Sequence, residues 1–430
     1  MKTELNRFDE VNRRQFMLKT AKTALGVTLL PMGAGRLRAE GTGPGSPGFG
    51  KAKAVIYLFM EGGMTHIDTW DPKTGSTKGA KDPIKAKGDS IGSLGGYMEN
   101  MAKVSDKIAL IRSMTSKTGV HESGRYIMRT GYEPRGTIVH PSMGAWASHF
   151  LGRIQGVTLP DSVVVNSGNA GPGAGFFPPA MSPIPISNPE VGLQNVNPTT
   201  GESTFEKRVS LMNEFDSSFR KKFESDEVSA YTEFYDETMK LMKSEDLKAF
   251  DLSEESADVR AKYGKDRFGQ GCLLARRLVE HGVRFIEVQM GGWDMHNYVD
   301  DAMGNRGATM DSVFAALIED LDSKGLLEST LVVMGSEFGR TPDINMNSGR
   351  DHYPIAYTTV LAGAGIKGGY AYGATDKDGR RVVDKPVTPP DFTATIGHAM
   401  GLPTEEVVMS PSGRPFTVGD KGEPVTGVFA

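Results

Sequence analysis

The chain has 430 residues, and its 49 Lys and Arg side chains nearly balance its 53 Asp and Glu side chains, which gives a formal net charge of −4. Because no basic block occurs beyond the first forty residues or so, nucleic acid is not expected as a partner. The single cysteine, Cys272, has no partner for an internal disulfide bond or for a Cys-x-x-Cys metal site. Stability must therefore come from the packed core and from any bound metal.

The start of the chain has the pattern of an export signal. The pair Arg13-Arg14 is followed by large apolar residues, a lysine and a short apolar stretch, and a peptidase could cut after Ala39. The apolar stretch is too short to span a bilayer. We therefore expect residues 1–40 to be a twin-arginine signal read by the translocase. The mature protein would be periplasmic or otherwise exported, without a stable membrane span. The alternative is an ordinary amphipathic helix that carries two arginines.

After a Gly/Pro/Ser linker, short apolar runs predict strands that are buried on both faces of a sheet. These runs are residues 54–60, 108–111, 162–165, 283–288, 330–334 and 356–361. Helical patterns at residues 268–281 and 310–324 end at Gly282 and Gly325, and each leads directly into one of the strands. This alternation predicts a single α/β domain over residues 51–430, with three α/β/α layers and a mainly parallel central sheet.

Two segments interrupt the alternating pattern. Residues 168–197 are rich in Gly, Pro, Asn and Ser, which predicts a long irregular loop insertion. Residues 203 to about 260 are polar and charge-rich, which predicts a helical insertion that lies over the surface.

Polar clusters lie beyond the predicted strands, where ligands bind in parallel sheets. In chain order the clusters contain His66 and Asp68, Asp294 and His296, Glu337, and Asp351 and His352. A carboxylate next to an imidazole is a mixed oxygen and nitrogen set that suits zinc, manganese or iron. Each cluster alone is more typical of a capped turn or a surface loop. Their convergence on one edge of the sheet predicts a metal site, and either His66 or Asp68 could supply the ligand from the first loop.

Residues 317–339 resemble a stretch of the sulfatases, which belong to the alkaline phosphatase superfamily. In sulfatases a helix leads into G-L-L-D-N-T, an apolar strand and S-D-H-G; here the corresponding residues are G-L-L-E-S-T and S-E-F-G. The resemblance implies that Glu337 stands where a metal-binding aspartate stands. It also puts Phe338, which cannot ligate a metal, where the superfamily has His or Asn.

The segment Asp294-Met295-His296 is similar to the D-P-H of sulfatases, in which the histidine contacts the anionic group of the substrate, and to Asp and His metal ligands of phosphatases. Residues 125–131 match the end of the sulfatase signature C-x-P-S-R-x-x-L-x-T-G. This alignment puts His121 at the position of the catalytic cysteine. Since histidine cannot become formylglycine, the resemblance does not extend to ordinary sulfatase chemistry.

His121 therefore has several interpretations. It could be a nucleophile, a general acid or base, or another metal ligand. The hydroxyl groups of Ser123 and Thr115 are near it in sequence and could serve instead. The simplest alternative is a loop histidine that is hydrogen-bonded within the core.

Over nearly its whole length the chain is identified as a member of a family of exported bacterial proteins known only as domain of unknown function 1501. The motifs that carry this resemblance are GG-x-x-H-x-D-T-x-D-P-K, GQ-x-x-LLARRLVE-x-GVRF, GGWD-x-H, EFGRTP and GRDH-x-P. The family implies an alkaline phosphatase-like fold and export, and it implies no particular reaction.

Together these patterns predict a metal-dependent hydrolase of sulfate or phosphate esters, whose substrate is a small-molecule or carbohydrate ester. The expected ligands of a divalent ion (zinc, manganese or calcium) are Asp68, Asp294, His296, Glu337, Asp351 and His352. Arg340 or Arg350 would orient the anion, and His121 would act at the attacking or leaving oxygen. Arg125 and His66 are the remaining expected substrate-binding residues.

Two other classes of function fit the same sequence. The first is an exported binding protein that keeps the fold, and a metal, without turnover; Phe338 and the missing nucleophile favour it. The second is a structural or assembly partner in an envelope complex, with residues 168–197 and the helices of 203–260 as the interface.

Overall fold

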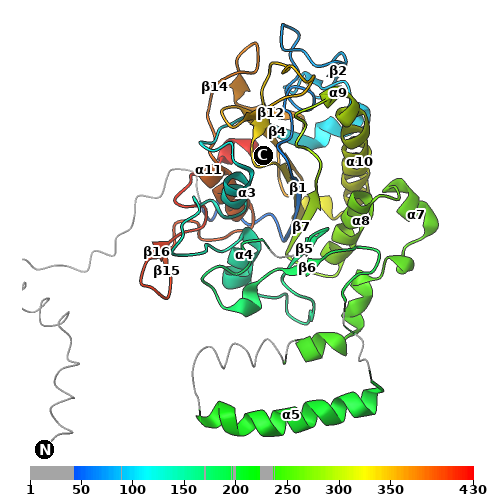
Figure 1. The fold of residues 1–430 in the computed structure, drawn as a ribbon, viewed down its shortest axis with the longest axis vertical. Coiled ribbons are helices and arrows are strands. Elements are labelled where there is room, and N and C mark those ends of the chain that lie inside the picture. Colours follow the sequence, from blue (N-terminus) through cyan, green and yellow to red (C-terminus); the bar gives the residue numbers. More distant parts are fainter. Residues whose placement is uncertain are drawn as a thin grey trace, which may run out of the picture. The chain divides into compact units, whose positions relative to one another are not determined.

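An eight-stranded sheet lies at the centre of the part of the chain that the structure describes (Figure 1). The computed structural model describes residues 43–430, except 89, 169–170, 195, 197–199, 223–235 and 237. The expected signal, residues 1–40, lies outside the described residues, so its assignment stays a prediction.

The strands of the central sheet follow the order β12-β4-β11-β8-β1-β7-β5-β6. Their bounds are β1 Ala54–Met60, β4 Ile108–Met114, β5 Ser162–Val165, β6 Ile184–Ile186, β7 Phe285–Met290, β8 Thr330–Gly335, β11 Tyr357–Ala362 and β12 Tyr370–Tyr372. Strand β11 is antiparallel to both of its neighbours, and the other neighbouring pairs in this sheet are parallel. The six strands predicted from apolar runs are present within a few residues of their expected bounds, and the mainly parallel sheet is confirmed.

The central strand β1 shows why apolar runs form this sheet. All seven of its residues are buried, and it pairs in parallel with β7 on one side and β8 on the other. Ile56 and Leu58 pack into one hydrophobic cluster, while Tyr57 and Phe59 pack into a second cluster on the opposite face. A strand with both faces covered gains from an apolar residue at every position.

Helices cover both faces of the sheet (Figure 1). Residues of α2 (Glu99–Val104), α8 (Arg267–Glu280) and α10 (Ala308–Ser323) belong to the first hydrophobic cluster. Residues of α3 (His121–Thr130), α4 (Met143–Leu151) and α11 (Pro389–Ala399) belong to the second cluster. The expected three-layer α/β/α arrangement is confirmed.

Residues 168–197 differ in part from the irregular loop that their composition predicts. They contain a short 3-10 helix, Pro179–Met181, and strand β6, which pairs in parallel with β5 at the edge of the sheet. The prediction missed β6 because an Ile-Pro-Ile run is short and its proline cannot donate to a neighbouring strand. Proline is tolerated at an edge, where only one side of the strand is paired.

Residues 203–260 include the helices that their composition predicts. The segment begins within α5 (Glu202–Lys222) and continues, in its described part, through two 3-10 helices, Glu245–Phe250 and Leu252–Glu254, into α7 (Ala257–Lys262). Ser256 caps the start of α7 by accepting a hydrogen bond from the backbone of Val259.

The remaining elements are short. They are β2 Ile84–Lys85, β3 Ser93–Leu94, β9 Gly339–Arg340, β10 His352–Tyr353, β13 Ala374–Thr375, β14 Val382–Asp384, β15 Val408–Met409, β16 Pro415–Phe416, α9 Val299–Ala302, a π-helix at Met303–Gly307, and 3-10 helices at Ser105–Lys107, Leu327–Ser329 and Thr426–Val428.

The direction of β11 decides what gathers at the carboxyl edge of the sheet. Strand β8 leaves the sheet at this edge, and the chain returns into β11, which runs the opposite way. Both ends of the connection, residues 336–356, therefore lie at the edge where β1 and β7 also end. The polar cluster before β11 thus joins the clusters that follow the parallel strands.

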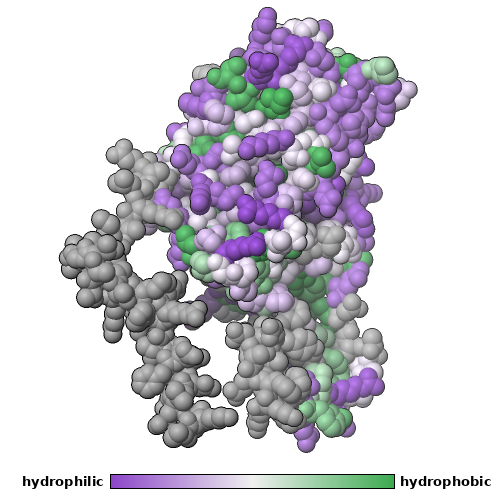
Figure 2. Space-filling view, turned by 60° about the vertical axis from the view of Figure 1, so that its left-hand side comes forward, coloured by the Kyte–Doolittle hydropathy of each residue, from purple (hydrophilic) through white to green (hydrophobic). Residues whose placement is uncertain are grey.

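None of the helices in the described part of the chain combines the length and the apolar composition that crossing a bilayer requires. The face drawn in Figure 2 is mainly hydrophilic, with hydrophobic side chains gathered in small patches.

We expect Asp266→Ala to weaken the start of α8. The Asp266 carboxylate accepts hydrogen bonds from the backbone N–H groups of Phe268 and Gly269 at 2.9 and 3.0 Å. Its loss should lower the free energy of unfolding in urea by about 1 kcal/mol. Asp258→Ala is the matched control, because Asp258 is exposed in the first turn of α7 while Ser256 caps that helix. Equal losses in the two variants would contradict the capping role.

Candidate metal centre

Four segments of the chain meet at the carboxyl edge of the sheet. His121 is the first residue of α3, and Asp294 and His296 lie in the segment that follows β7. Glu337 comes two residues after β8, and His352 begins β10. Their positions follow from the sheet topology, since each segment starts or ends on a strand at this edge.

The carboxylate of Asp294 is the centre of the group. Its Oδ1 atom lies 3.0 Å from His296 Nε2, 3.2 Å from His352 Nε2 and 3.4 Å from His121 Nε2, and it accepts a hydrogen bond from Arg340 Nη2. Burial raises the pKa of Asp294, but the hydrogen bond and the positive charge of Arg340 outweigh it. The pKa of Asp294 is lowered to about 2, so its carboxylate is anionic at neutral pH.

Each of the three imidazoles is anchored through its Nδ1 atom. The contacts are His121 Nδ1 to Glu337 Oε1 at 2.8 Å, His296 Nδ1 to Asp351 Oδ1 at 2.7 Å, and His352 Nδ1 to the carbonyl oxygen of Gly119 at 2.7 Å. Carbonyl and carboxylate oxygens accept hydrogen bonds, so each Nδ1 donates. In the neutral imidazole the proton is then on Nδ1, and Nε2 presents a lone pair.

The Nε2 lone pairs converge. The Nε2 atoms of His296 and His352 are 2.9 Å apart, which is a repulsive contact between two neutral rings unless a proton or a cation lies between the nitrogens. His121 Nε2 is buried and has no hydrogen-bond partner among the residues that the structure describes. Among the described residues, His121, Asp294 and His352 have ligand atoms that all lie within 4.8 Å of one another. The group has the donor atoms of a cation site.

Glu337 supports His121 from behind. Its side chain is buried and also accepts hydrogen bonds from the backbone N–H of Gly62 at 2.9 Å and from Ser336 Oγ at 3.2 Å. Helix α3 approaches so closely that a Cβ atom at Gly124 would lie 2.9 Å from Glu337 Cβ. The expected ligand Glu337 therefore orients His121, and it does not belong to the group of three ligands.

Asp351 supports His296 in the same way, and Asn345 supports both. Asn345 Nδ2 donates to Asp351 Oδ1 and to the carbonyl of His296, each at 3.0 Å, while its Oδ1 accepts from the backbone of Asn347 and Gly349. Hydrogen bonds from His296 and Asn345 lower the pKa of Asp351. The sequence reasoning missed Asn345, although an Asn at the start of an Asn-Met-Asn-Ser-Gly turn is a signal for such a role.

Two of the expected site residues pair with each other. Arg350 Nε and Nη2 lie 2.8 and 3.2 Å from the two carboxylate oxygens of Asp68, and both side chains are buried. Asp68 also accepts from Thr65 Oγ1, while Arg350 Nη1 donates to the carbonyls of Thr341 and Pro342. In the structure Asp68 is therefore the counterion of Arg350, and each guanidinium nitrogen of Arg350 has an acceptor within the protein. The expected roles of Asp68 as a metal ligand and of Arg350 toward an anion stay predictions.

The guanidinium of Arg340 also forms its hydrogen bonds with groups of the protein. It is fully buried and donates to the carbonyl oxygens of Gly62, Gly63 and Arg350 as well as to Asp294. The expected role of Arg340 toward a substrate anion stays a prediction, and the contacts that the structure shows are all within the protein. Its guanidinium holds Asp294 and ties three segments of the edge together.

The two expected substrate-binding residues differ in position. His66 is buried, its Nε2 lies 2.9 Å from the carbonyl of Gly379, and burial lowers the pKa of its imidazole, so a substrate cannot contact it there. Arg125 keeps 40% of its side chain exposed, donates from Nε to the carbonyl of His121 at 3.3 Å, and has Nη1 3.9 Å from Glu61 Oε1. Its partly exposed side chain thus contacts the backbone of His121, and its role stays a prediction.

Phe338 forms an apolar wall of the site. The ring is fully buried, and its centroid lies 5.0 Å from that of His121 and 4.8 Å from that of His352. A side chain without ligand atoms thus stands where the sulfatase-like motif has His or Asn.

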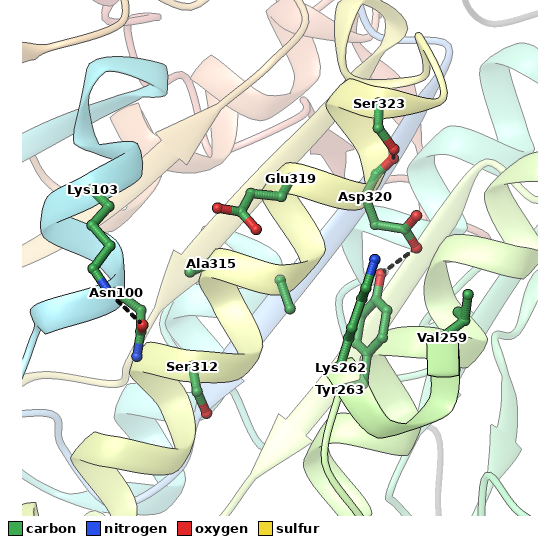
Figure 3. A pocket seen from close by; sticks show the side chains of 11 residues that line it. Asn100, Lys103, Val259, Lys262, Tyr263, Ser312, Ala315, Glu319, Asp320 and Ser323 are labelled. Carbon is green, nitrogen blue, oxygen red and sulfur yellow. Dashed lines mark hydrogen bonds between the residues drawn. The ribbon is translucent and has the colours of Figure 1, made fainter. Parts of the chain in front are cut away.

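A pocket of about 480 Å³ lies elsewhere, lined by α2, α7 and α10 (Figure 3). Lys103, Lys262, Glu319 and Asp320 line it, and Tyr263 Oη donates to Asp320 Oδ2 at 2.8 Å. Both signs of charge are present, so electrostatics favour no single class of ligand, and none of the expected site residues lies in this lining.

The family model described as "Protein of unknown function (DUF1501)" matches residues 52–429. No curated protein matches the chain in sequence.

Several solved structures are similar to the chain at low identity. The lipoteichoic acid synthase LtaP from Listeria monocytogenes is 10% identical, with 90% of this chain and 79% of that chain covered and a TM-score of 0.41. The PsFucS1 sulfatase from Pseudoalteromonas sp. is 13% identical, with 88% and 72% covered and a TM-score of 0.42. A protein in the alkaline phosphatase superfamily from Vibrio parahaemolyticus is 11% identical, with 90% and 73% covered and a TM-score of 0.39.

We expect Asp68→Asn to destabilise the fold strongly. The substitution leaves the buried Arg350 guanidinium without its counterion, and breaking a buried pair in this way typically costs about 3–5 kcal/mol. Urea unfolding should show this loss, whereas the metal content of the folded fraction should stay unchanged.

The control uses the same pairing geometry at the surface. Arg380 donates from Nε and Nη2 to the two carboxylate oxygens of Asp343, but both side chains are solvent-exposed. Asp343→Asn should therefore have a much smaller effect on unfolding. A stable Asp68→Asn variant that loses metal would restore Asp68 as a ligand.

Proposed function

The chain belongs to the DUF1501 family of proteins of unknown function, and we propose that it is a metal-dependent hydrolase of sulfate or phosphate esters. The observation that carries the proposal is the convergence of the Nε2 atoms of His121, His296 and His352 on the anionic carboxylate of Asp294. The support given to each ring through Nδ1 is the arrangement that metal-binding histidines use, because it fixes the tautomer and the ring orientation.

The donor set and its spacing fit a transition-metal ion. Ligand atoms around a tetrahedral zinc ion lie about 3.3 Å apart, given metal to ligand distances of about 2.0–2.1 Å. Within the group of His121, Asp294 and His352, Asp294 Oδ1 lies 3.2 Å from His352 Nε2 and 3.4 Å from His121 Nε2. His296 Nε2 lies 3.0 Å from the same oxygen but does not belong to that group. Imidazole-rich sets suit zinc or manganese, whereas calcium takes oxygen ligands. Of the three ions expected from the sequence, calcium is the one that this set disfavours.

The residues around the ligands have separate tasks. Glu337, Asp351 and the Gly119 carbonyl orient the rings, and Arg340 orients Asp294. Arg125, the exposed guanidinium beside His121, would bind free oxygens of the ester group. When bound, a divalent cation would polarise the ester oxygens and stabilise the charge that develops during hydrolysis. Water would add to the ester, which would release an alcohol and inorganic sulfate or phosphate.

Phe338 favours a second candidate, a metal-bearing binding protein without turnover. The ring fills the position of a ligand in the sulfatase-like motif and packs against His121 and His352. With His121 also in place of the nucleophilic cysteine, the chain could bind an anion or ester and leave it intact.

We expect the purified protein to carry about one divalent ion per chain, measured by inductively coupled plasma mass spectrometry. His352→Ala and Asp294→Ala should remove it, because each loses a ligand. Glu337→Gln should weaken metal affinity by roughly 10–100-fold, since it changes only the support of His121. His281→Ala, at an exposed position after α8, is the control and should keep the metal.

Turnover of 4-nitrophenyl sulfate and 4-nitrophenyl phosphate decides between the two candidates. If hydrolysis is present in the wild-type protein and falls with metal content across the same variants, the hydrolase is supported. Stoichiometric metal without turnover on either ester favours the binding protein. A metal-free protein, or unchanged metal content in His352→Ala and Asp294→Ala, contradicts both candidates.

We also propose that residues 1–40 direct export by the twin-arginine route. Replacing both Arg13 and Arg14 with Lys should leave the protein in the cytoplasmic fraction of the producing cells, as shown by immunoblotting of fractionated cells. Arg7→Lys, in the same leader but outside the pair, should still be exported. Export of the double variant would contradict the assignment.

A further inference from the structure

Several exposed apolar side chains lie on the chain segments that form the candidate metal centre. Of the twelve large hydrophobic residues that are exposed in the described part of the chain, five lie on the segments that carry the site. They are Val120 (61% exposed), Tyr298 (68%), Ile344 (50%), Met346 (96%) and Ile355 (48%). We call these five residues the apolar rim. Exposed apolar groups that gather at one place commonly mark a binding surface.

On one side of the centre, Tyr298 and Met346 lie on segments that are paired through their backbones. Tyr298 N–H donates to the carbonyl of Asn347 at 3.1 Å, and Val299 N–H donates to that of Ser348 at 2.9 Å. His296, two residues before Tyr298, is anchored on this second segment through Asp351. Tyr298 and Met346 therefore lie on two paired segments, and these segments also carry His296 and its partner Asp351.

On the other side, Val120 and Ile355 lie on another pair of segments. Ser116 N–H donates to the carbonyl of Pro354 at 2.8 Å, and His352 Nδ1 donates to the carbonyl of Gly119 at 2.7 Å. Val120 directly precedes the ligand His121, and Ile355 follows His352 by three residues. The residues of the rim thus lie on the segments that carry His121, His296 and His352.

The backbone of Tyr298 gives independent support. Its φ of 47° and ψ of 53° place it in the left-handed region, which is unfavourable for a bulky side chain and easier for Asn or Gly. Its ring is mostly exposed, so burial within the protein does not offset this strain. A strained residue of this kind typically serves a function rather than the stability of the fold.

We infer that the apolar rim binds the organic group of the ester, so that the substrates are sulfate or phosphate esters of aliphatic or aromatic alcohols. The inference rests on the proposed function. An anionic head bound between the histidine group and Arg125 would leave its organic group among residues that are chain neighbours of the ligands. The tyrosine ring offers a flat apolar surface, and the flexible methionine side chain adapts to the shape of the group.

The test is the affinity of wild-type protein, with its metal, for a series of alkylphosphonates from methyl to heptyl, measured by calorimetry. These probes carry a phosphate-like head that is not hydrolysed. Kd should fall along the series, up to about three- to fourfold for each methylene that becomes fully buried. Tyr298→Asn and Met346→Ser should flatten this dependence on chain length. Tyr298→Asn should also raise the melting temperature, because Asn relieves the strained backbone.

Met409→Ser is the matched control, since Met409 is 56% exposed on β15, outside the segments of the rim, and this variant should keep the full dependence. Binding of methylphosphonate with no gain along the series overturns the inference and spares the proposed function. A gain that persists unchanged in both rim variants overturns the assignment to Tyr298 and Met346. If no phosphonate binds, the anion site itself is wrong, and the inference fails with the proposed function.

Discussion

The hydrogen bond between the buried Arg340 guanidinium and Asp294 is the contact on which the candidate site depends. Arg340 also donates to the carbonyl oxygens of Gly62, Gly63 and Arg350, so one side chain joins the segments that follow β1, β7 and β8. A buried guanidinium requires a partner of opposite charge, and Asp294 supplies it. The same contact keeps Asp294 anionic, and an anionic carboxylate beside several imidazoles is what attracts a cation.

Much of the fold could be predicted because the sequence patterns that indicate it, such as apolar runs, are local. A run such as residues 54–60 reports burial on both faces of a strand, and the structure places every residue of β1 in the core. The direction of β11 could not be predicted, since an apolar run is equally compatible with parallel and with antiparallel pairing. That direction nevertheless brings Asp351 and His352 to the edge where Asp294 lies. Strand β6 was missed because its signal, three residues with a proline, is weaker than the composition of the loop around it.

The sequence predicted where the candidate site lies, but it predicted the roles of the individual residues less well. Sequence spacing put carboxylates and imidazoles at one edge of the sheet, and Asp294, His296 and His352 do meet there. It could not show that Arg350 takes Asp68 as its counterion, because the two residues are 282 positions apart and their pairing depends on tertiary structure. Nor could it separate residues that face the centre from those behind it. Glu337 and Asp351 have the chemistry of ligands, yet each is engaged with the Nδ1 atom of a histidine.

The residues that support the histidines are buried and polar, whereas those of the apolar rim are exposed and apolar. Behind the histidines, carboxylates, guanidinium groups and carbonyls are buried and hydrogen-bonded, which fixes the rings because breaking any such contact leaves a polar group unpaired. In front of them, Tyr298 and Met346 leave apolar surface in water, and Tyr298 also adopts a strained backbone conformation. Asn or Gly at position 298 would relieve this strain, and the exposed side chain of Met346 contributes little to the free energy of unfolding. Stability thus explains the residues behind the histidines and does not explain those in front, which is why we ascribe the rim to ligand binding.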